Sequence, residues 1–150
     1  MTRVMLTEDQ VNVAVKAFLE GRGWANVKAL SGNQKGVDVA GDHPQGSLHV
    51  HVESKGGTSG RSTSARFGAC FDTAAVCVHV AEAVFTALRL RERSRENAVM
   101  IAVPDDDAHL SRIQPVERTL RSLNIGLLAV SPNGVRVVYG LVEPSSTLSA

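Results

Sequence analysis

Residues 36–57, GVDVAGDHPQGSLHVHVESKGG, decide the fold of this chain, because they read as two short strands joined by a turn. The first strand carries Asp38 between two valines. The second alternates apolar and polar side chains, reaches Glu53 and is followed by Lys55. Period-two alternation bounded by Gly and Pro is typical of a half-buried hairpin, and residues 42–46 supply the turn. The hairpin is therefore expected to bring Asp38, Glu53 and Lys55 to one end of a sheet.

Hydrophobic periodicity along the rest of the chain predicts alternating helices and strands. The first helix begins at a capping box formed by Thr7 and Gln10. The expected elements are a helix over 8–20, strands over 24–30, 36–41 and 47–54, a helix over 72–93, a strand over 98–103, a helix over 109–123, and strands over 125–130 and 135–139. The long helix is apolar nearly all round at first, so it is expected to be substantially buried. This order predicts an α/β fold, a three-layer α/β/α sandwich around a mixed sheet.

Length and composition predict one domain over residues 1–143, followed by a polar C-terminal tail at 144–150. The net charge of +1 indicates no polyanion partner by itself, so any contact with nucleic acid needs a local basic patch. No apolar run approaches the roughly 18–20 residues that span a bilayer, and the N-terminus does not read as a signal peptide. Cys70 and Cys77 form no disulfide framework. We therefore expect a cytoplasmic protein without a membrane segment, with reduced, buried thiols.

The order of elements, with Asp38 on the second strand and Glu53-Ser54-Lys55 closing the third, resembles the PD-(D/E)xK nuclease superfamily, including its type II restriction and Mrr-like members. The resemblance covers residues 8–138. It implies a restriction-endonuclease-like fold and Mg²⁺- or Mn²⁺-dependent hydrolysis of nucleic acid, with DNA as the expected substrate. The chain departs from the pattern in two places. Val37 stands where Pro is common, and the helix over 72–93 has neither the Gln nor the Lys of some relatives.

The residue types also fit this chemistry on their own terms. Phosphodiester hydrolysis needs neutralised charge at phosphorus and an oriented water, and Mg²⁺ prefers oxygen ligands. Asp38 and Glu53 supply carboxylates for a metal, and the carbonyl of Ser54 can add a third oxygen. Lys55 is expected to position the water or to stabilise developing charge. Glu8 matches the place of an additional superfamily acid, with Glu20, at the other end of the same helix, as the alternative.

Other interpretations remain open. Glu53 and Lys55 lie two apart on one face and could form a plain surface ion pair. Arg61 and Arg66, in a Ser/Gly-rich loop beside the expected site, are candidates for binding phosphates of nucleic acid. The alternative function is a catalytically inactive module on the same fold that binds nucleic acid or protein. Because so small a domain has little surface for reading a long sequence, a homodimer or a partner protein is expected.

Overall fold

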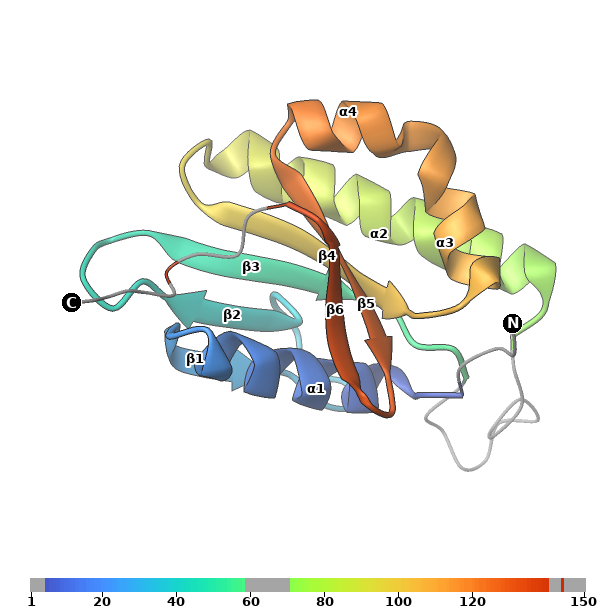
Figure 1. Ribbon diagram of the computed structural model, residues 1–150, viewed down its shortest axis with the longest axis horizontal. Helices are drawn as coiled ribbons and strands as arrows, with labels where there is room; N and C mark the ends of the chain where they lie inside the picture. Colours follow the sequence, from blue (N-terminus) through green and yellow to red (C-terminus); the bar gives the residue numbers. More distant parts are fainter. Residues whose placement is uncertain (1–4, 59–70, 141–143, 145–150) are drawn as a thin grey trace.

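The computed structural model describes residues 5–58, 71–140 and 144, which form a six-stranded mixed sheet with helices on both faces (Figure 1). The helices are α1 (Glu8–Gly21), α2 (Thr73–Arg93), α3 (Asp107–Ile113), the 3₁₀ turn η1 (Gln114–Val116) and α4 (Glu117–Ser122). The strands are β1 (Ala25–Ala29), β2 (Val39–Asp42), β3 (His49–Ser54), β4 (Ala98–Pro104), β5 (Ile125–Ser131) and β6 (Gly134–Tyr139). The mixed α/β class and the order of elements are as predicted from the sequence.

The strands lie in the sheet in the order in which the chain forms them, from β1 to β6. The strands β1, β2 and β3 form an antiparallel meander. The strands β3, β4 and β5 are parallel, and β6 returns antiparallel to β5. Parallel neighbours require crossover connections, which α2 supplies between β3 and β4 and the α3–α4 segment supplies between β4 and β5. The C-terminal ends of β3 and β4 and the start of β2 therefore lie at the same end of the sheet.

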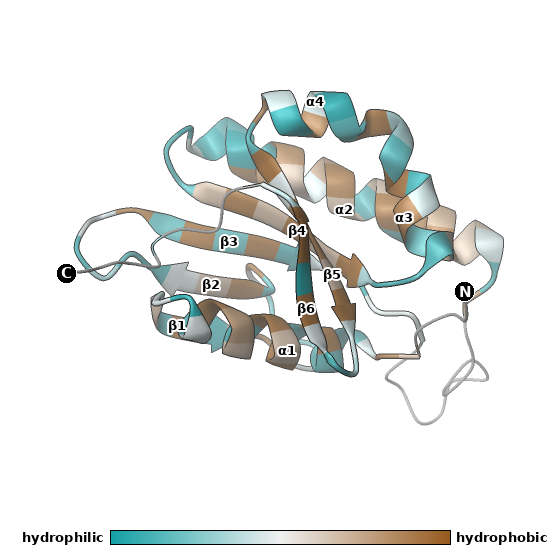
Figure 2. Cartoon of the chain, viewed as in Figure 1, coloured by the Kyte–Doolittle hydropathy of each residue, from teal (hydrophilic) through white to brown (hydrophobic). Residues whose placement is uncertain are grey.

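Two separate apolar cores seal the two faces of the sheet. Val11, Val15 and Leu19 of α1 pack on one face, in a core that contains buried side chains of every strand from β1 to β5. Val76, Val80 and the C-terminal half of α2 pack on the other, with Ile113 of α3 and Leu120 of α4. Nearly every residue of β4 is buried, because helices cover both of its faces, and the brown central strands of Figure 2 show the result. The sheet is thus the middle layer between α1 and the α2–α4 layer.

The helix expected over 109–123 is interrupted. It begins earlier, at Asp107, because the side chain of Asp106 accepts a hydrogen bond from the main-chain N–H of His109 at 2.9 Å. Pro115 has no N–H to donate, so α3 ends at Ile113, a 3₁₀ turn follows, and α4 begins at Glu117. The sequence prediction of one continuous helix is wrong at this point.

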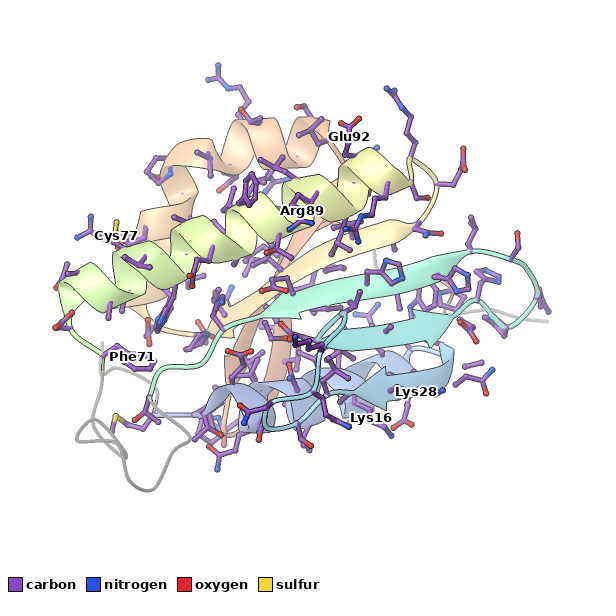
Figure 3. All side chains as sticks on the ribbon, turned by 180° about the vertical axis from the view of Figure 1, so that it is seen from behind. Lys16, Lys28, Phe71, Cys77, Arg89 and Glu92 are labelled. Carbon is purple, nitrogen blue, oxygen red and sulfur yellow. The ribbon has the colours of Figure 1, made fainter. Side chains whose placement is uncertain are left out.

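The helix α2 is also less buried than its sequence predicts. One side of it packs on the sheet, but Val78 is 55% and Phe85 63% exposed, and Cys77, predicted to be buried, is exposed too. Cys77 and Glu92 project from the side of α2 turned away from the sheet (Figure 3). By length and composition alone, α2 is apolar enough to cross a membrane. Since a helix that packs on a folded core passes the same test, this property does not assign α2 to a bilayer.

Candidate active site

The residues predicted to form the site meet where β2 begins and β3 ends. Val39 pairs with Val52, so Asp38, one residue before β2, lies opposite Glu53 across the two strands. The Asp38 carboxylate accepts a hydrogen bond from the main-chain N–H of Ser54 at 2.9 Å. Val39 and Val52 face α1, and strand alternation therefore turns Asp38, Glu53 and Lys55 toward the side of α2. The hairpin thus brings the three side chains to one end of the sheet.

Gly56 explains how Glu8 reaches the same place. A Cβ on Gly56 would lie 2.4 Å from the main-chain nitrogen of Glu8, so only glycine lets the chain after β3 run against the start of α1. The contact is fixed by the Gly57 N–H, which donates to the carbonyl of Leu6 at 2.7 Å. The first turn of α1 is thereby held beside Lys55. The Gly-Gly pair after Lys55 was the sequence signal for this close approach.

The ammonium of Lys55 lies between two carboxylates. Its Nζ is 3.8 Å from Glu53 Oε2 and 3.4 Å from Glu82 Oε1, and the Lys55 and Glu53 side chains are only 15% and 13% exposed. This burial rejects the interpretation of Glu53 and Lys55 as an exposed surface pair. Glu82, on α2, is a site residue that the sequence prediction missed. In the sequence, Glu82 is a single acid in the apolar half of the helix that follows the Glu-x-Lys strand. The sequence interpretation looked there only for the Gln or Lys of some superfamily members.

Crowding of acidic groups perturbs the protonation of this site. Burial, followed by the neighbouring charge of Asp38, raises the pKa of Glu53 from 4.5 to about 8, against the opposing effect of Lys55. The two carboxyl groups share a hydrogen bond, in which the protonated Glu53 donates to Asp38. Burial and the charge of Asp38 also raise the pKa of Glu8. Without a bound cation, the site holds so much negative charge that one carboxyl group keeps its proton. A cation would replace this proton, so the site has the charge expected of a cation-binding site.

The carboxylates of Asp38 and Glu53 fit a hard divalent cation such as Mg²⁺, because such ions prefer oxygen ligands. Ser54 adds a main-chain carbonyl. The Lys55 N–H bonds to Ala102 on β4, so the N–H and C=O of the preceding residue face β2 and Asp38. No group of three His, Cys, Asp or Glu side chains within the described ranges is arranged to hold a metal by itself. A cation here would therefore need the Ser54 carbonyl, water or substrate oxygens beside the two carboxylates.

A cleft of about 480 Å³ lies beside these groups, and Glu8, Lys55 and Glu82 are in its wall, whereas Asp38 and Glu53 lie behind Lys55 and do not line it. Phe71, which immediately precedes the cap of α2 and is labelled in Figure 3, forms another part of the cleft wall. His79 lines the same part of the cleft. The rings of Phe71 and His79 meet edge to face at 4.6 Å. The cleft is large enough for a phosphodiester group with its flanking sugars and lies directly over Lys55.

Other predicted residues fall elsewhere. Glu20 is excluded from the site, because it pairs with Lys16 at 2.8 Å near the far end of α1. The imidazole of His49, on β3, lies away from the carboxylate cluster and donates its Nδ1–H to the Asp42 carboxylate at 2.8 Å. Arg61 and Arg66 lie outside the described residues, so their expected contact with nucleic acid remains a prediction.

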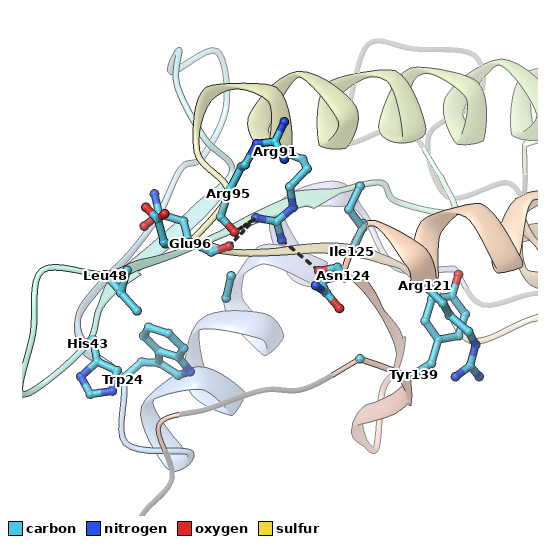
Figure 4. A pocket seen from close by; sticks show the side chains of 13 residues that line it. Trp24, His43, Leu48, Arg91, Arg95, Glu96, Arg121, Asn124, Ile125 and Tyr139 are labelled. Carbon is cyan, nitrogen blue, oxygen red and sulfur yellow. Dashed lines mark hydrogen bonds between the residues drawn. The ribbon is translucent and has the colours of Figure 1, made fainter.

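A larger cavity, of about 650 Å³, lies at the opposite end of the sheet, between Trp24 and Tyr139 (Figure 4). Arg91 contributes to its wall, but the guanidinium donates hydrogen bonds to five main-chain carbonyls, including that of Asn97 at 2.7 Å. These bonds tie the end of α2 to the starts of β4 and β5. We therefore assign Arg91 a structural role. The candidate active site is the cleft over Lys55, which Glu8 and Glu82 also line.

Comparison with known proteins adds no relative. No model of a protein family matches this chain, and neither a search of curated proteins nor one of solved structures finds a match.

Proposed function

We propose that this protein is a Mg²⁺-dependent nuclease with a restriction-endonuclease-like fold, which hydrolyses phosphodiester bonds in DNA. The observation that carries the proposal is the convergence of Asp38, Glu53 and Lys55 at the ends of β2 and β3, beside a cleft that Lys55 lines, with the pKa of Glu53 raised to about 8. Buried like charges destabilise a fold unless a ligand uses them, so their presence together supports a binding role. The meander, crossover helix and parallel strand around them support the same class of fold.

The carboxylates of Asp38 and Glu53, with the carbonyl of Ser54, would hold the metal ion. When bound, such an ion supplies Lewis-acid polarisation of the phosphate and neutralises charge that develops on it. Binding requires Glu53 to release its proton, so metal affinity should rise with pH toward about 8. Asp38 is already oriented by the hydrogen bond from the Ser54 N–H. The hairpin thus prepares the ligands before substrate arrives.

Lys55 has two tasks in this proposal. Its ammonium, nearly buried beside Glu53, holds the attacking water by hydrogen bonding and stabilises negative charge on the phosphate oxygens. Glu82 acts as a positioning residue, because its carboxylate, 3.4 Å away, fixes the ammonium on the cleft side of β3. Glu8, whose pKa is also raised, lies close enough to accept a proton from a water in the cleft.

The charge of the cleft explains why a cation is needed. The acids Glu8, Asp38, Glu53 and Glu82 surround a single lysine, and together they would repel a phosphodiester. A divalent ion reverses this balance at the point of reaction. Arg61 and Arg66, which follow the site along the chain, are the proposed contacts to flanking phosphates.

Nicking of supercoiled plasmid DNA, with Mg²⁺ and then Mn²⁺, tests the proposal. The wild type should cut. Lys55→Met and Asp38→Asn should each lose about 10²–10⁴-fold in rate, and Glu82→Gln should lose less, because it acts only through Lys55. Lys16→Met, which removes an exposed lysine on α1, is the matched control and should cut like the wild type.

Equal cutting by Lys55→Met and the wild type would refute the assigned role of this lysine. A folded wild type that binds duplex DNA but never cuts would favour the inactive binding module instead.

A further inference from the structure

The outer side of α2 carries an exposed seam whose spacing is that of a coiled coil. Positions 74, 78, 81, 85, 88 and 92 alternate steps of four and three residues, and all of them are exposed. The seam residues are Ala74, Val78, Ala81, Phe85, Leu88 and Glu92. Steps of four and three keep side chains on one stripe of a helix, which is the arrangement that packs against a second helix. The stripe is about 27 Å long at the usual rise per residue.

The sequence of the seam is complementary to itself when it is reversed. In antiparallel pairing about the midpoint between positions 81 and 85, small Ala81 lies opposite bulky Phe85, and Val78 lies opposite Leu88. Each layer then combines a smaller and a larger side chain, as well-packed interfaces do. A groove of about 440 Å³ runs beside Ala81, between α2 and η1. Phe85 of the partner subunit would lie at the rim of this groove.

The charges on the helix favour the same direction of pairing. The C-terminal end of α2 exposes Arg89 and Arg93, whereas its N-terminal end begins at the exposed Asp72. Antiparallel pairing about this midpoint places Arg93 of each copy opposite Thr73 of the other, beside its Asp72. Parallel pairing would place the arginines against their own copies, which is unfavourable.

We propose that α2 is the contact surface of a twofold-symmetric homodimer, in which the seam of one chain packs antiparallel against the same seam of a second copy. A twofold interface uses one patch on both subunits, and a self-complementary stripe satisfies this requirement. The dimer accounts for Phe85, which is 63% exposed with the guanidinium of Arg89 6.0 Å above its ring. This inference does not rest on the proposed nuclease activity.

Light scattering and sedimentation of the full chain over a range of concentrations test the dimer. The wild type should reach twice the 15.9 kDa of one chain, and Phe85→Glu should remain at the mass of one. Val13→Glu is the matched control, because Val13 is 66% exposed on α1, and it should dimerise like the wild type. Val78→Glu serves as a second seam variant if Phe85→Glu loses its helical circular dichroism.

The register is tested by cysteine cross-linking in a Cys70→Ser, Cys77→Ser background. Mixed Ala81→Cys and Phe85→Cys chains should cross-link to each other, whereas self-linking of Phe85→Cys chains would overturn the antiparallel arrangement. A wild type that stays monomeric, or a dimer that survives both Phe85→Glu and Val78→Glu, would overturn the proposal. A monomer that sediments with phosphatidylcholine vesicles would assign the seam to lipid and overturn it as well.

Discussion

Replacing Glu53 with glutamine should stabilise the metal-free protein, and the gain should depend on pH. The pKa of Glu53 is raised in the folded state from 4.5 to about 8. Below pH 4.5, the pKa of Glu53 in the unfolded chain, the folded and the unfolded states both hold the proton, so this carboxyl group costs no stability. Between the two values the unfolded chain releases the proton and the folded chain keeps it. The free energy of unfolding of the wild type must therefore fall as pH rises through this interval and level off near pH 8.

The size of the effect follows from the shift. One pKa unit corresponds to about 1.4 kcal/mol, so the full shift sets an upper limit of about 5 kcal/mol. Coupling to Asp38 and residual solvent contact reduce this limit, and we expect Glu53→Gln to gain about 2 kcal/mol at about pH 8 and under about 0.5 kcal/mol at about pH 5. The glutamine amide can still donate to Asp38, so the hydrogen bond between the two side chains is retained.

Urea unfolding of the wild type and of Glu53→Gln at the two pH values, without metal, measures both gains in the free energy of unfolding. Glu20→Gln, which removes an exposed carboxylate of α1 paired with Lys16, is the control and should show no comparable gain at high pH. Added Mg²⁺ should then stabilise the wild type at about pH 8 more than it stabilises Glu53→Gln, because the ion binds the ionised carboxylate. A variant that is no more stable than the wild type at about pH 8, or that gains equally at both pH values, would refute the charge-crowding argument.

Three further predictions concern the supports of the site and fold. Gly56→Ala should destabilise the protein by about 1–3 kcal/mol in urea unfolding, because its Cβ would overlap the start of α1; Gly21→Ala, which has open space, should not. Arg91→Ala should lower stability by about 1–3 kcal/mol, since five main-chain carbonyls, two of them in part-buried hydrogen bonds, lose their donor, whereas exposed Arg118→Ala should change it by less than about 0.5 kcal/mol. Lys55→Met should slow cutting by about 10²–10⁴-fold and should also lower the free energy of unfolding at about pH 8, because it removes the ammonium that offsets the charges of Glu53 and Glu82.

The strands were predictable because their apolar pattern is set by burial. The continuous apolar run of β4 indicates a strand covered on both faces, and the alternation of β3 indicates one that carries polar groups toward a cleft. The placement of Asp38, Glu53 and Lys55 followed from the hairpin alone. Glu8 depended on a tertiary contact, and only the glycine after Lys55 hinted at it.

The sequence did not predict which sides of a helix pack against other elements of the fold. The pattern of α2 suggested burial all round, but the sheet covers one side only, and residues such as Phe85 are left on the outer side. Glu82 looked like an isolated acid until the crossover placed it 3.4 Å from Lys55. Pro115, by contrast, was a local signal for a helix break that was overlooked.

Calorimetric titration of Mn²⁺ into the wild type and into Asp38→Asn, each repeated with a short DNA duplex present, tests the central claim most directly. We expect a binding heat in the wild type that disappears in the variant, with tighter binding when duplex is present. Equal heats in both proteins, or no binding to the wild type even with duplex, would contradict a metal-dependent site at Asp38 and Glu53.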